Sequence, residues 1–320
     1  MSKKLDRRTF TKLISIGGLG LIMSNFNCYQ EKPNKIIPKE FSKLPSPDYY
    51  NISHNPIKWE SVSKGLGFSR TEIYRAGELV DVIATIKINP DKNKIRVFNG
   101  YNKTDTETNF IEEWQRKTGA LAMVNGSPYV EKYSPRALVI CDGKQKWPKD
   151  NKNNKFSKGM FLAEPKNLEG KLKRADLLDF DYDKFDYKTT PYTQGVQHWP
   201  ILLDREEKIK VNETDWQANR TVIAKTKEDE ILFMTTEGGY FTLYNLGRFL
   251  KESNQRIDNG FNIHTAMNLD GGHSAEMVVK SSNIEYLNYG KFVRRNPKNE
   301  TSPFNFKVKI PGVIGVFPRD

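Results

Sequence analysis

The residues best suited to chemistry lie together near the C-terminal end of the chain. There a carboxylate is followed at once by two glycines, an imidazole and a hydroxyl: Asp270, Gly271, Gly272, His273 and Ser274. Glycine lets the backbone adopt a left-handed conformation and approach a ligand closely, and turns at strand ends commonly carry functional groups. Asp-Gly is also an ordinary hairpin turn, so this stretch alone leaves a site and a plain turn equally open.

Four further stretches accompany this one in order along the chain. They are Met123-Val124-Asn125-Gly126, Gln197-His198-Trp199-Pro200-Ile201-Leu202, Arg220-Thr221-Val222-Ile223-Ala224 and Gly312-Val313-Ile314-Gly315-Val316-Phe317. Together with Asn268-Leu269-Asp270-Gly271-Gly272, the ordered set resembles the phosphodiester glycosidase domain family over roughly residues 75–318. His273, Trp199 and Ser127-Pro128-Tyr129 depart from the family pattern, which affects substrate identity more than the fold.

The resemblance implies hydrolysis of a sugar-1-phosphodiester. Such a reaction needs help for an oxocarbenium-like centre, which glycosidases usually supply with two carboxylates. We expect Asp270 to be one of them, with Glu237 or Glu276 as the other and His273 as a partner that titrates near neutrality. A phosphomonoester leaves as a weak base, with a second pKa of about 6, so a cradle of donors can replace part of the acid's work.

The same resemblance implies a phosphate and sugar site. Arg220 offers a bidentate fork, and we expect the backbone N–H groups of Gly271 and Gly272 to add donors. The other substrate-binding residues implied are Asn125, Gly126, Gln197, Thr221 and Ser274.

Several of these residues have ordinary structural alternatives. Arg220 fits a surface strand, Asn125 a plain Asn-Gly turn and Glu237 a helix start. Glu276 alternates to the face opposite Met277, which predicts a solvent-exposed side chain. His198 fits either a sugar contact or a core histidine.

Two other functions remain open. The first is a non-catalytic carbohydrate-binding protein of the cell envelope that keeps the scaffold. The second is a metal-dependent phosphodiesterase with Asp270 and His273 as ligands, but one Asp and one His do not make a site. We therefore expect no metal and no cofactor. The net charge is +12, yet no lysine-rich tract alternates with aromatic residues, so the expected partner is a glycan or sugar phosphate and not a nucleic acid.

The first 28 residues predict export. Arg7-Arg8 resembles a twin-arginine signal, and the apolar run Leu13 to Met23 is too short to span a bilayer. Cys28 follows and would suit a lipid anchor, although Asn25-Phe26-Asn27 is a poor lipidation motif. We expect a signal over 1–28, a lead-in over 29–72 and a catalytic domain over 73–320, placed in the periplasm or cell envelope, with membrane attachment if Cys28 is lipidated.

The element pattern predicts an α+β fold: mixed, largely antiparallel sheets flanked by a few helices in a single domain. Residues 79–88 form a strand that residues 95–98 pair with across a turn. One helix covers residues 109–117, with Thr108 as cap and Gly119 past its end, and a second begins at the cap Thr242. Residues 220–225 and 231–236 form a hairpin.

The export signal yields the first testable prediction. Replacing Arg7 and Arg8 with lysine keeps the charge but removes the arginine pair, so the precursor should accumulate inside the cell. Immunoblotting of cell fractions measures this. Unchanged export would exclude the twin-arginine route, and a variant with Lys3 and Lys4 replaced by arginine controls for general changes in the basic region.

Overall fold

The computed structural model describes most of the chain beyond the lead-in. The described residues are 49, 51–100, 107–130, 133–148, 157–169, 172–214, 216–255, 260–291, 293–294 and 307–319. The expected export signal, with Arg7, Arg8 and Cys28, lies outside them. The α+β class is confirmed: antiparallel sheets dominate, and two α-helices flank them in the described part of the chain.

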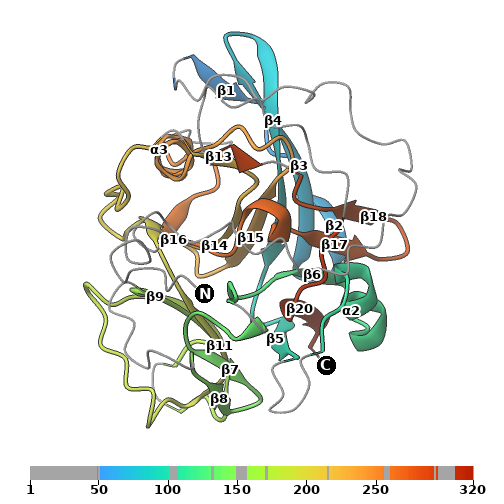
Figure 1. The fold of residues 1–320 in the computed structure, drawn as a ribbon, viewed down its shortest axis with the longest axis vertical. Coiled ribbons are helices and arrows are strands. Elements are labelled where there is room, and N and C mark those ends of the chain that lie inside the picture. Colours follow the sequence, from blue (N-terminus) through green and yellow to red (C-terminus); the bar gives the residue numbers. More distant parts are fainter. Residues whose placement is uncertain are drawn as a thin grey trace, which may run out of the picture.

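An eight-stranded antiparallel sheet forms the largest layer (Figure 1). Its strands, in spatial order, are β1 (Ile52–His54), β3 (Leu66–Arg75), β4 (Glu78–Ile88), β15 (Ile231–Thr236), β14 (Thr221–Thr226), β16 (Ile263–Asn268) and β12 (Ile201–Leu203), with β2 (Glu60–Ser63) paired to β3. The hairpin of β14 and β15 is confirmed, with Thr221 opposite Thr235. The sheet thus includes residues 52–75, upstream of the position at which the sequence places the start of the domain.

Two five-stranded sheets complete the architecture. One contains β18 (Glu285–Asn288), β17 (Met277–Lys280), β6 (Ala122–Asn125), β20 (Gly312–Pro318) and β5 (Asn93–Asn99). The other contains β10 (Ala175–Asp179), β9 (Gly159–Pro165), β11 (Tyr192–His198), β7 (Val139–Cys141) and β8 (Lys144–Lys146), and β13 (Gln217–Ala218) pairs with β19 (Val293–Arg294). The predicted pairing of residues 95–98 with 79–88 is wrong: β3 and β15 occupy both edges of β4, so β5 pairs with β20.

The helices lie on the outer faces of two different sheets (Figure 1). Helix α2 (Ile111–Thr118) ends at Gly119, whose φ of 73° is the expected left-handed cap. Its predicted N-cap Thr108 is wrong, because Phe110 occupies that position and its N–H donates to Glu113 at 3.1 Å. Helix α3 (Leu243–Ser253) starts as predicted, since Thr242 Oγ1 accepts the N–H of Asn245 at 3.1 Å.

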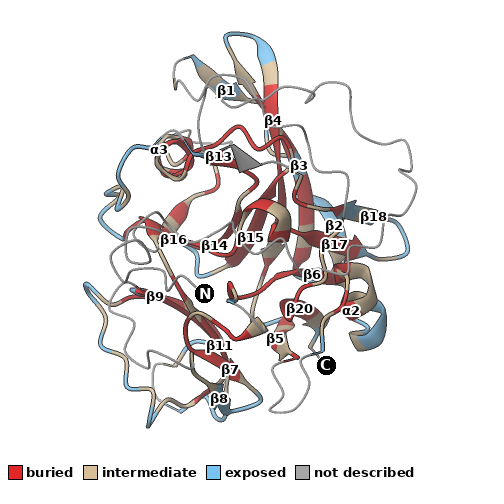
Figure 2. Ribbon diagram, viewed as in Figure 1, coloured by how far each residue is buried: buried red, intermediate tan, exposed pale blue. Residues whose placement is uncertain are grey.

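The central strands are buried on both faces (Figure 2). In β14, Ile223 belongs to the core shared by the three sheets, while Val222 and Ala224 pack toward α3. All six residues of β14 and of β15 are buried. Residues at the ends of these strands are therefore held by a close-packed interior with little freedom to move. Within the described residues, no helix has the length and apolar character that crossing a membrane requires.

Candidate active site

The Asp270 stretch is the place where the chain crosses from one sheet to another. Strand β16 of the eight-stranded sheet ends at Asn268, and β17 of a five-stranded sheet begins at Met277. Between them, Gly272–Ser274 form a single 3-10 turn, in which Gly272 has a φ of +64°. The crossing therefore has a compact, fixed geometry and is not a loose loop.

Glycine is required on both sides of this crossing. A Cβ built on Gly271 would lie 2.9 Å from the carbonyl oxygen of Asn219, and one built on Gly290 would lie 1.8 Å from that of Gly272. The N–H of Gly272 donates to Asn219 O at 2.8 Å, and that of Gly271 donates to Asp270 Oδ1 at 3.1 Å. Both N–H groups are thus used within the protein, and the expectation that they serve as phosphate donors is not supported.

The side chain of Asn125 binds both ends of the crossing through hydrogen bonds. Its Nδ2 donates to the backbone oxygen of Asp270 at 2.9 Å. Its Oδ1 accepts from Thr221 Oγ1 at 2.7 Å and from the N–H of Glu276 at 3.1 Å. Asn125 and Thr221 are both buried. These two predicted binding residues therefore hold the backbone at Asp270 through their hydrogen bonds.

The carboxyl group of Asp270 is itself almost fully buried, with the residue 6% exposed. Burial raises its pKa to about 6, and hydrogen bonding from Ser274 and Gly271 together with the positive charge of Arg136 opposes that rise. Asp270 is thus mostly ionised at neutral pH, and its protonated form becomes populated as the pH falls toward 6.

Two residues near Asp270 were not predicted from the sequence. The hydroxyl of Tyr129 lies 3.4 Å from Ser274 Oγ, and burial and the charge of Asp270 raise its pKa. Arg136 acts electrostatically on both Asp270 and His198. Tyr129 could have been predicted from its position shortly after Asn125-Gly126. No motif around Arg136 indicates that it lies near Asp270.

Arg220 also lies close to Gly271. A Cβ on Gly271 would be 3.9 Å from Arg220 Nη1, which, with standard backbone dimensions, places that atom at most about 10 Å from Asp270 Oδ1. The guanidinium donates to two backbone oxygens, of Trp216 at 2.5 Å and of Phe241 at 3.3 Å. Among the described residues no carboxylate pairs with it, and burial lowers its pKa to about 10.

The two candidates for a second carboxylate lie elsewhere. Glu237 accepts two hydrogen bonds from Arg70, at 2.8 and 2.7 Å, and one from the hydroxyl of Tyr286 at 2.8 Å. Its oxygens are therefore engaged in an ion pair, and Glu237 does not cap the following helix, which starts at Thr242. Neither Glu237 nor Glu276 contributes to the pKa shift of Asp270.

The predicted exposure of Glu276 is wrong. Its side chain is 0% exposed because α2 covers that face of the five-stranded sheet, where Ile111 and Trp114 pack beside Val278. Among the described residues neither carboxyl oxygen of Glu276 has a hydrogen-bond partner. The nearby N–H of Ile111 acts to lower the pKa of Glu276. Burial, reinforced by the charge of Glu112, raises the pKa of Glu276 well above its usual value and so favours its protonated form.

Three further residues predicted for the site are His273, Gly126 and Gln197. His273 lies partly exposed in the 3-10 turn. The N–H of Gly126 donates to Gly312 O at 2.9 Å, joining β6 to β20. The amide of Gln197 accepts from Leu138 N at 3.2 Å and donates to Ser157 O at 2.8 Å, so both of its ends are occupied.

His198 is a core histidine. It is 4% exposed, its Nδ1 lies 2.6 Å from Asn268 O, and its ring stacks on Trp199 at 4.7 Å. Burial lowers its pKa to about 3, so it is neutral in the physiological range.

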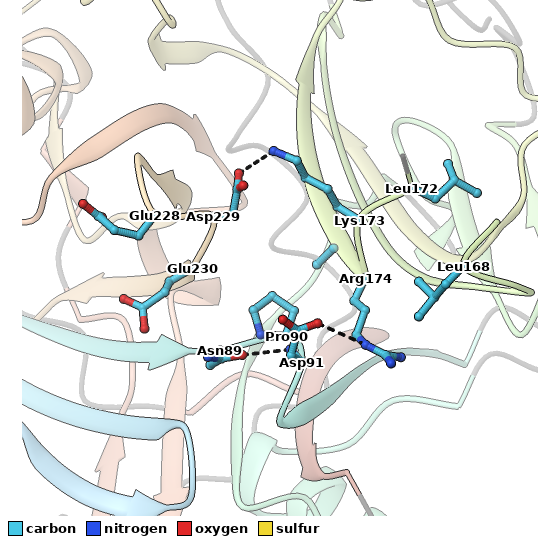
Figure 3. Close-up of a pocket in the computed structure, with 11 residues that line it drawn as sticks. Asn89, Pro90, Asp91, Leu168, Leu172, Lys173, Arg174, Glu228, Asp229 and Glu230 are labelled. Carbon is cyan, nitrogen blue, oxygen red and sulfur yellow. Dashed lines mark hydrogen bonds and ion pairs between the residues drawn. The ribbon is translucent and has the colours of Figure 1, made fainter. Parts of the chain in front are cut away.

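A separate cleft of about 330 Å³ lies between the turn after β4, the β14–β15 turn and the start of strand β10 (Figure 3). Four of its charged groups form ion pairs: Lys173 with Asp229 at 2.5 Å and Arg174 with Asp91 at 3.1 Å. None of the predicted site residues line it. Across the described residues, no three His, Cys, Asp or Glu side chains gather as metal ligands do.

Comparisons with known proteins identify the family of the chain. The family model described as phosphodiester glycosidase matches residues 118–317. The chain belongs to the phosphodiester glycosidase family. The match covers β6, β14, β16 and β17, and so all the strands that place Asn125, Arg220 and Asp270. No curated protein matches the chain in a sequence comparison.

Solved structures share the fold of this family member at low identity. The zebrafish N-acetylglucosamine-1-phosphodiester alpha-N-acetylglucosaminidase catalytic domain, auto-inhibited by its pro-peptide, is 16% identical with a TM-score of 0.53, and 87% of each chain is covered. A hypothetical protein from Synechocystis is 13% identical with a TM-score of 0.50. That match covers 83% of this chain but only 64% of the Synechocystis chain. At such identities the likeness establishes the fold.

The tight packing of the crossing yields the second prediction. Gly290→Ala should destabilise the protein, because its Cβ would overlap the oxygen of Gly272 and overpacking typically costs about 1–3 kcal/mol. Gly67→Ala is the matched control: the nearest atom to its Cβ is Trp59 Cε3 at 3.4 Å, an ordinary contact. Urea unfolding of both variants measures the difference in the free energy of unfolding. Equal values would mean that the backbone at the crossing can shift to accept the added Cβ at no cost.

Proposed function

We propose that this protein is an exported hydrolase that cleaves a sugar-1-phosphodiester at the anomeric carbon. Family membership supports this reaction class. The observation that carries the proposal is the arrangement around Gly271, which lies near both the buried carboxylate of Asp270 and the half-buried guanidinium of Arg220. Among the described residues no carboxylate pairs with Arg220, which favours a site completed by an anionic ligand.

The spacing of these two charges fits a sugar phosphate. A ligand whose anomeric carbon contacts Asp270 and whose phosphate contacts Arg220 bridges a gap of at most about 10 Å, given the backbone dimensions at Gly271. Asp270 then stabilises the positive charge at the anomeric carbon and accepts the proton of the attacking water. The bond between that carbon and the phosphate oxygen breaks, and its electron pair leaves with the phosphate.

A single carboxylate is sufficient for this leaving group. Glycosidases that expel an alcohol use an acid to protonate it, but a phosphomonoester is a weak base, with a second pKa of about 6. Positive charge at the phosphate can therefore take the place of the acid. We assign that part to Arg220, with its planar fork, and assign Glu237 to holding the turn that follows β15 through its ion pair with Arg70.

Export and attachment complete the proposal. The arginine pair and the apolar run near the N-terminus support a location outside the cytoplasm, in the periplasm or cell envelope. Lipidation of Cys28 would tether it to the membrane through the lead-in. Mass spectrometry of the mature protein tests whether Cys28 carries a lipid.

The third prediction concerns Asp270. Asp270→Asn keeps the shape but removes the charge, so kcat should fall at least about a hundredfold, within the usual range for acid–base groups. In the unmodified enzyme, kcat/KM should rise with pH through about 6 as Asp270 ionises. Initial rates on a panel of sugar-1-phosphodiesters between pH 4 and 9 measure both.

The same assay separates the two leading functions. Hydrolysis that survives Asp270→Asn would remove the carboxylate from the mechanism. If the unmodified protein binds sugar phosphodiesters without cleaving any of them, the carbohydrate-binding function replaces the enzyme.

The fourth prediction tests the single-carboxylate mechanism. Neither Glu237→Gln nor Glu276→Gln should lower kcat by more than about tenfold, below the usual effect of removing an acid or base. The two variants should differ in stability, because Glu237→Gln disrupts the ion pair with Arg70 whereas Glu276→Gln removes a buried carboxyl group that has no ion-pair partner among the described residues. A loss as large as that of Asp270→Asn in either variant would identify a second catalytic carboxylate.

A further inference from the structure

The guanidinium of Arg220 is held by two backbone carbonyl groups. Its Nη2 donates to Trp216 O at 2.5 Å, and its Nε donates to Phe241 O at 3.3 Å. Phe241 is buried and lies in the segment 237–241, between the end of β15 and the N-cap of α3. The direction in which Arg220 points therefore depends on where this segment is held.

A carboxyl group on the neighbouring strand β4 fixes that segment. Oδ1 of Asp81 accepts the N–H of Gly238 at 2.6 Å, and Oδ2 accepts the N–H of Tyr240 at 2.9 Å. Oδ1 also accepts the N–H of Val82 at 2.8 Å, within β4 itself. Asp81 is 0% exposed, and no side chain of the described residues forms an ion pair with it. Both of its oxygens are thus bound to backbone N–H groups, and two of these groups belong to the segment that holds Arg220.

The choice of a carboxyl group at position 81 is informative. Burying a charge without a counter-ion is unfavourable, and packing alone does not require it. A carboxylate, however, accepts on both oxygens, and its hydrogen bonds are roughly twice as strong as those between neutral groups. Asp81 therefore gives up solvation and in return attaches the segment 237–241 firmly to β4.

We propose that Asp81 is a positioning residue for Arg220: it fixes the segment 237–241, whose carbonyl group at Phe241 aims the guanidinium at the anionic group of the substrate. Asp81 does not contact the substrate and acts on Arg220 through this backbone. The catalytic meaning of the inference rests on the proposed function, in which Arg220 binds the phosphate, whereas the hydrogen-bonded connection does not.

The protonation state of Asp81 sets the strength of the attachment. Burial raises its pKa to about 7, the three N–H groups oppose this rise, and the charge of Glu237 adds to it. A protonated carboxyl group carries an O–H donor, so one of the N–H groups then faces a donor instead of an acceptor. The segment is therefore held most firmly when the pH is above about 7, and more loosely below that value.

The charged and titratable groups that face Asp81 come from the segment itself. Glu237 is bound to Arg70 at 2.7 Å, so its charge is compensated. Tyr240 is buried, and the residue opposite Asp81 on β3 is the apolar Ile73. These groups stay in place when Asp81 is changed, so its own contribution can be measured.

The test follows the Nε–H group of Arg220 by NMR, in the full chain labelled with nitrogen-15 arginine. The signal of Arg220 is the one missing from Arg220→Lys. Asp81→Asn keeps the shape of the side chain but turns an amide donor toward one of the N–H groups, so the Arg220 signal should move. In the unmodified protein the same signal should shift with pH around a midpoint of about 7, and Asp81→Asn should abolish that shift.

Sulfate added to the same samples measures anion binding at Arg220. Sulfate keeps its charge through the neutral range, so its affinity reports on the protein alone. At a pH at which Asp81 is ionised, Asp81→Asn should raise the Kd for sulfate by about tenfold, as expected when one hydrogen bond to a positioned group is lost.

Asp204 offers a matched control. It is also buried, and its carboxyl group likewise accepts backbone N–H groups of a turn, those of Glu206 at 3.0 Å and Lys208 at 2.8 Å. Asp204→Asn should therefore leave the Arg220 signal and the sulfate affinity unchanged. An Arg220 signal that moves no more in Asp81→Asn than in Asp204→Asn would overturn the proposal.

A second route serves if Asp81→Asn does not fold. Asp270 titrates at about pH 6 and His273 lies in the turn that follows it, so both are removed in the double variant Asp270→Asn, His273→Gln. The Arg220 signal of this variant should still shift around pH 7, because Asp81 is unchanged. A signal that is independent of pH in the double variant would also refute the positioning role.

These measurements need no sugar substrate, so they fail independently of the proposed function. An Arg220 signal that follows Asp81 in a protein that cleaves no sugar phosphodiester would preserve the positioning role and remove the enzyme. Active hydrolysis with an Arg220 signal that ignores Asp81 would remove the positioning role and preserve the enzyme.

Discussion

The structure depends on one buried amide at the point where two sheets meet. Buried polar groups must find partners, and Asn125 satisfies this requirement by binding the backbone of Asp270, the backbone of Glu276 and the hydroxyl of Thr221. These partners come from the end of one sheet, the start of another and the neighbouring strand. A single side chain thus fixes both ends of the crossing, and the glycines between them let the backbone pass without steric overlap.

The chemistry follows from that constraint. Because the crossing is held inside the protein, the carboxyl group of Asp270 is desolvated, and its pKa rises to about 6. The same packing holds the half-buried guanidinium of Arg220 near Gly271, without a carboxylate partner among the described residues. In a medium of low dielectric charges act more strongly than in water. The fold therefore presents a carboxylate and a cation at most about 10 Å apart, given the backbone dimensions at Gly271.

The sequence predicts local features well and long-range partners poorly. The cap at Thr242, the turn at Gly119 and the hairpin of β14 and β15 depend on neighbouring residues, and all three are confirmed. The pairing of β5 with β20 joins residues more than two hundred positions apart, and no local pattern specifies it.

The site shows the same division. Residue types and spacing point to Asp270, and the resemblance adds Arg220, because short motifs carry both residues. Arg136 was missed, since its importance comes from proximity across the fold. Glu276 was expected to be exposed, because the alternation of a strand gives the face of a residue but not what covers that face; here it is α2. The ion pair of Glu237 with Arg70 was likewise invisible, as the two residues are 167 positions apart.

The arrangement is better matched to a phosphate leaving group than to an alcohol. An alkoxide is a strong base and needs an acid within reach of the breaking bond. Among the described residues, the carboxyl group of Glu276 is buried under α2 and Glu237 is bound to Arg70, and neither shifts the pKa of Asp270. A phosphomonoester instead leaves as an anion, and its second pKa of about 6 coincides with that of Asp270. Both become fully ionised over the same pH range, while Arg220, with a pKa of about 10, keeps its charge. In the proposed reaction, the desolvation that sets these two pKa values therefore also favours a phosphate leaving group.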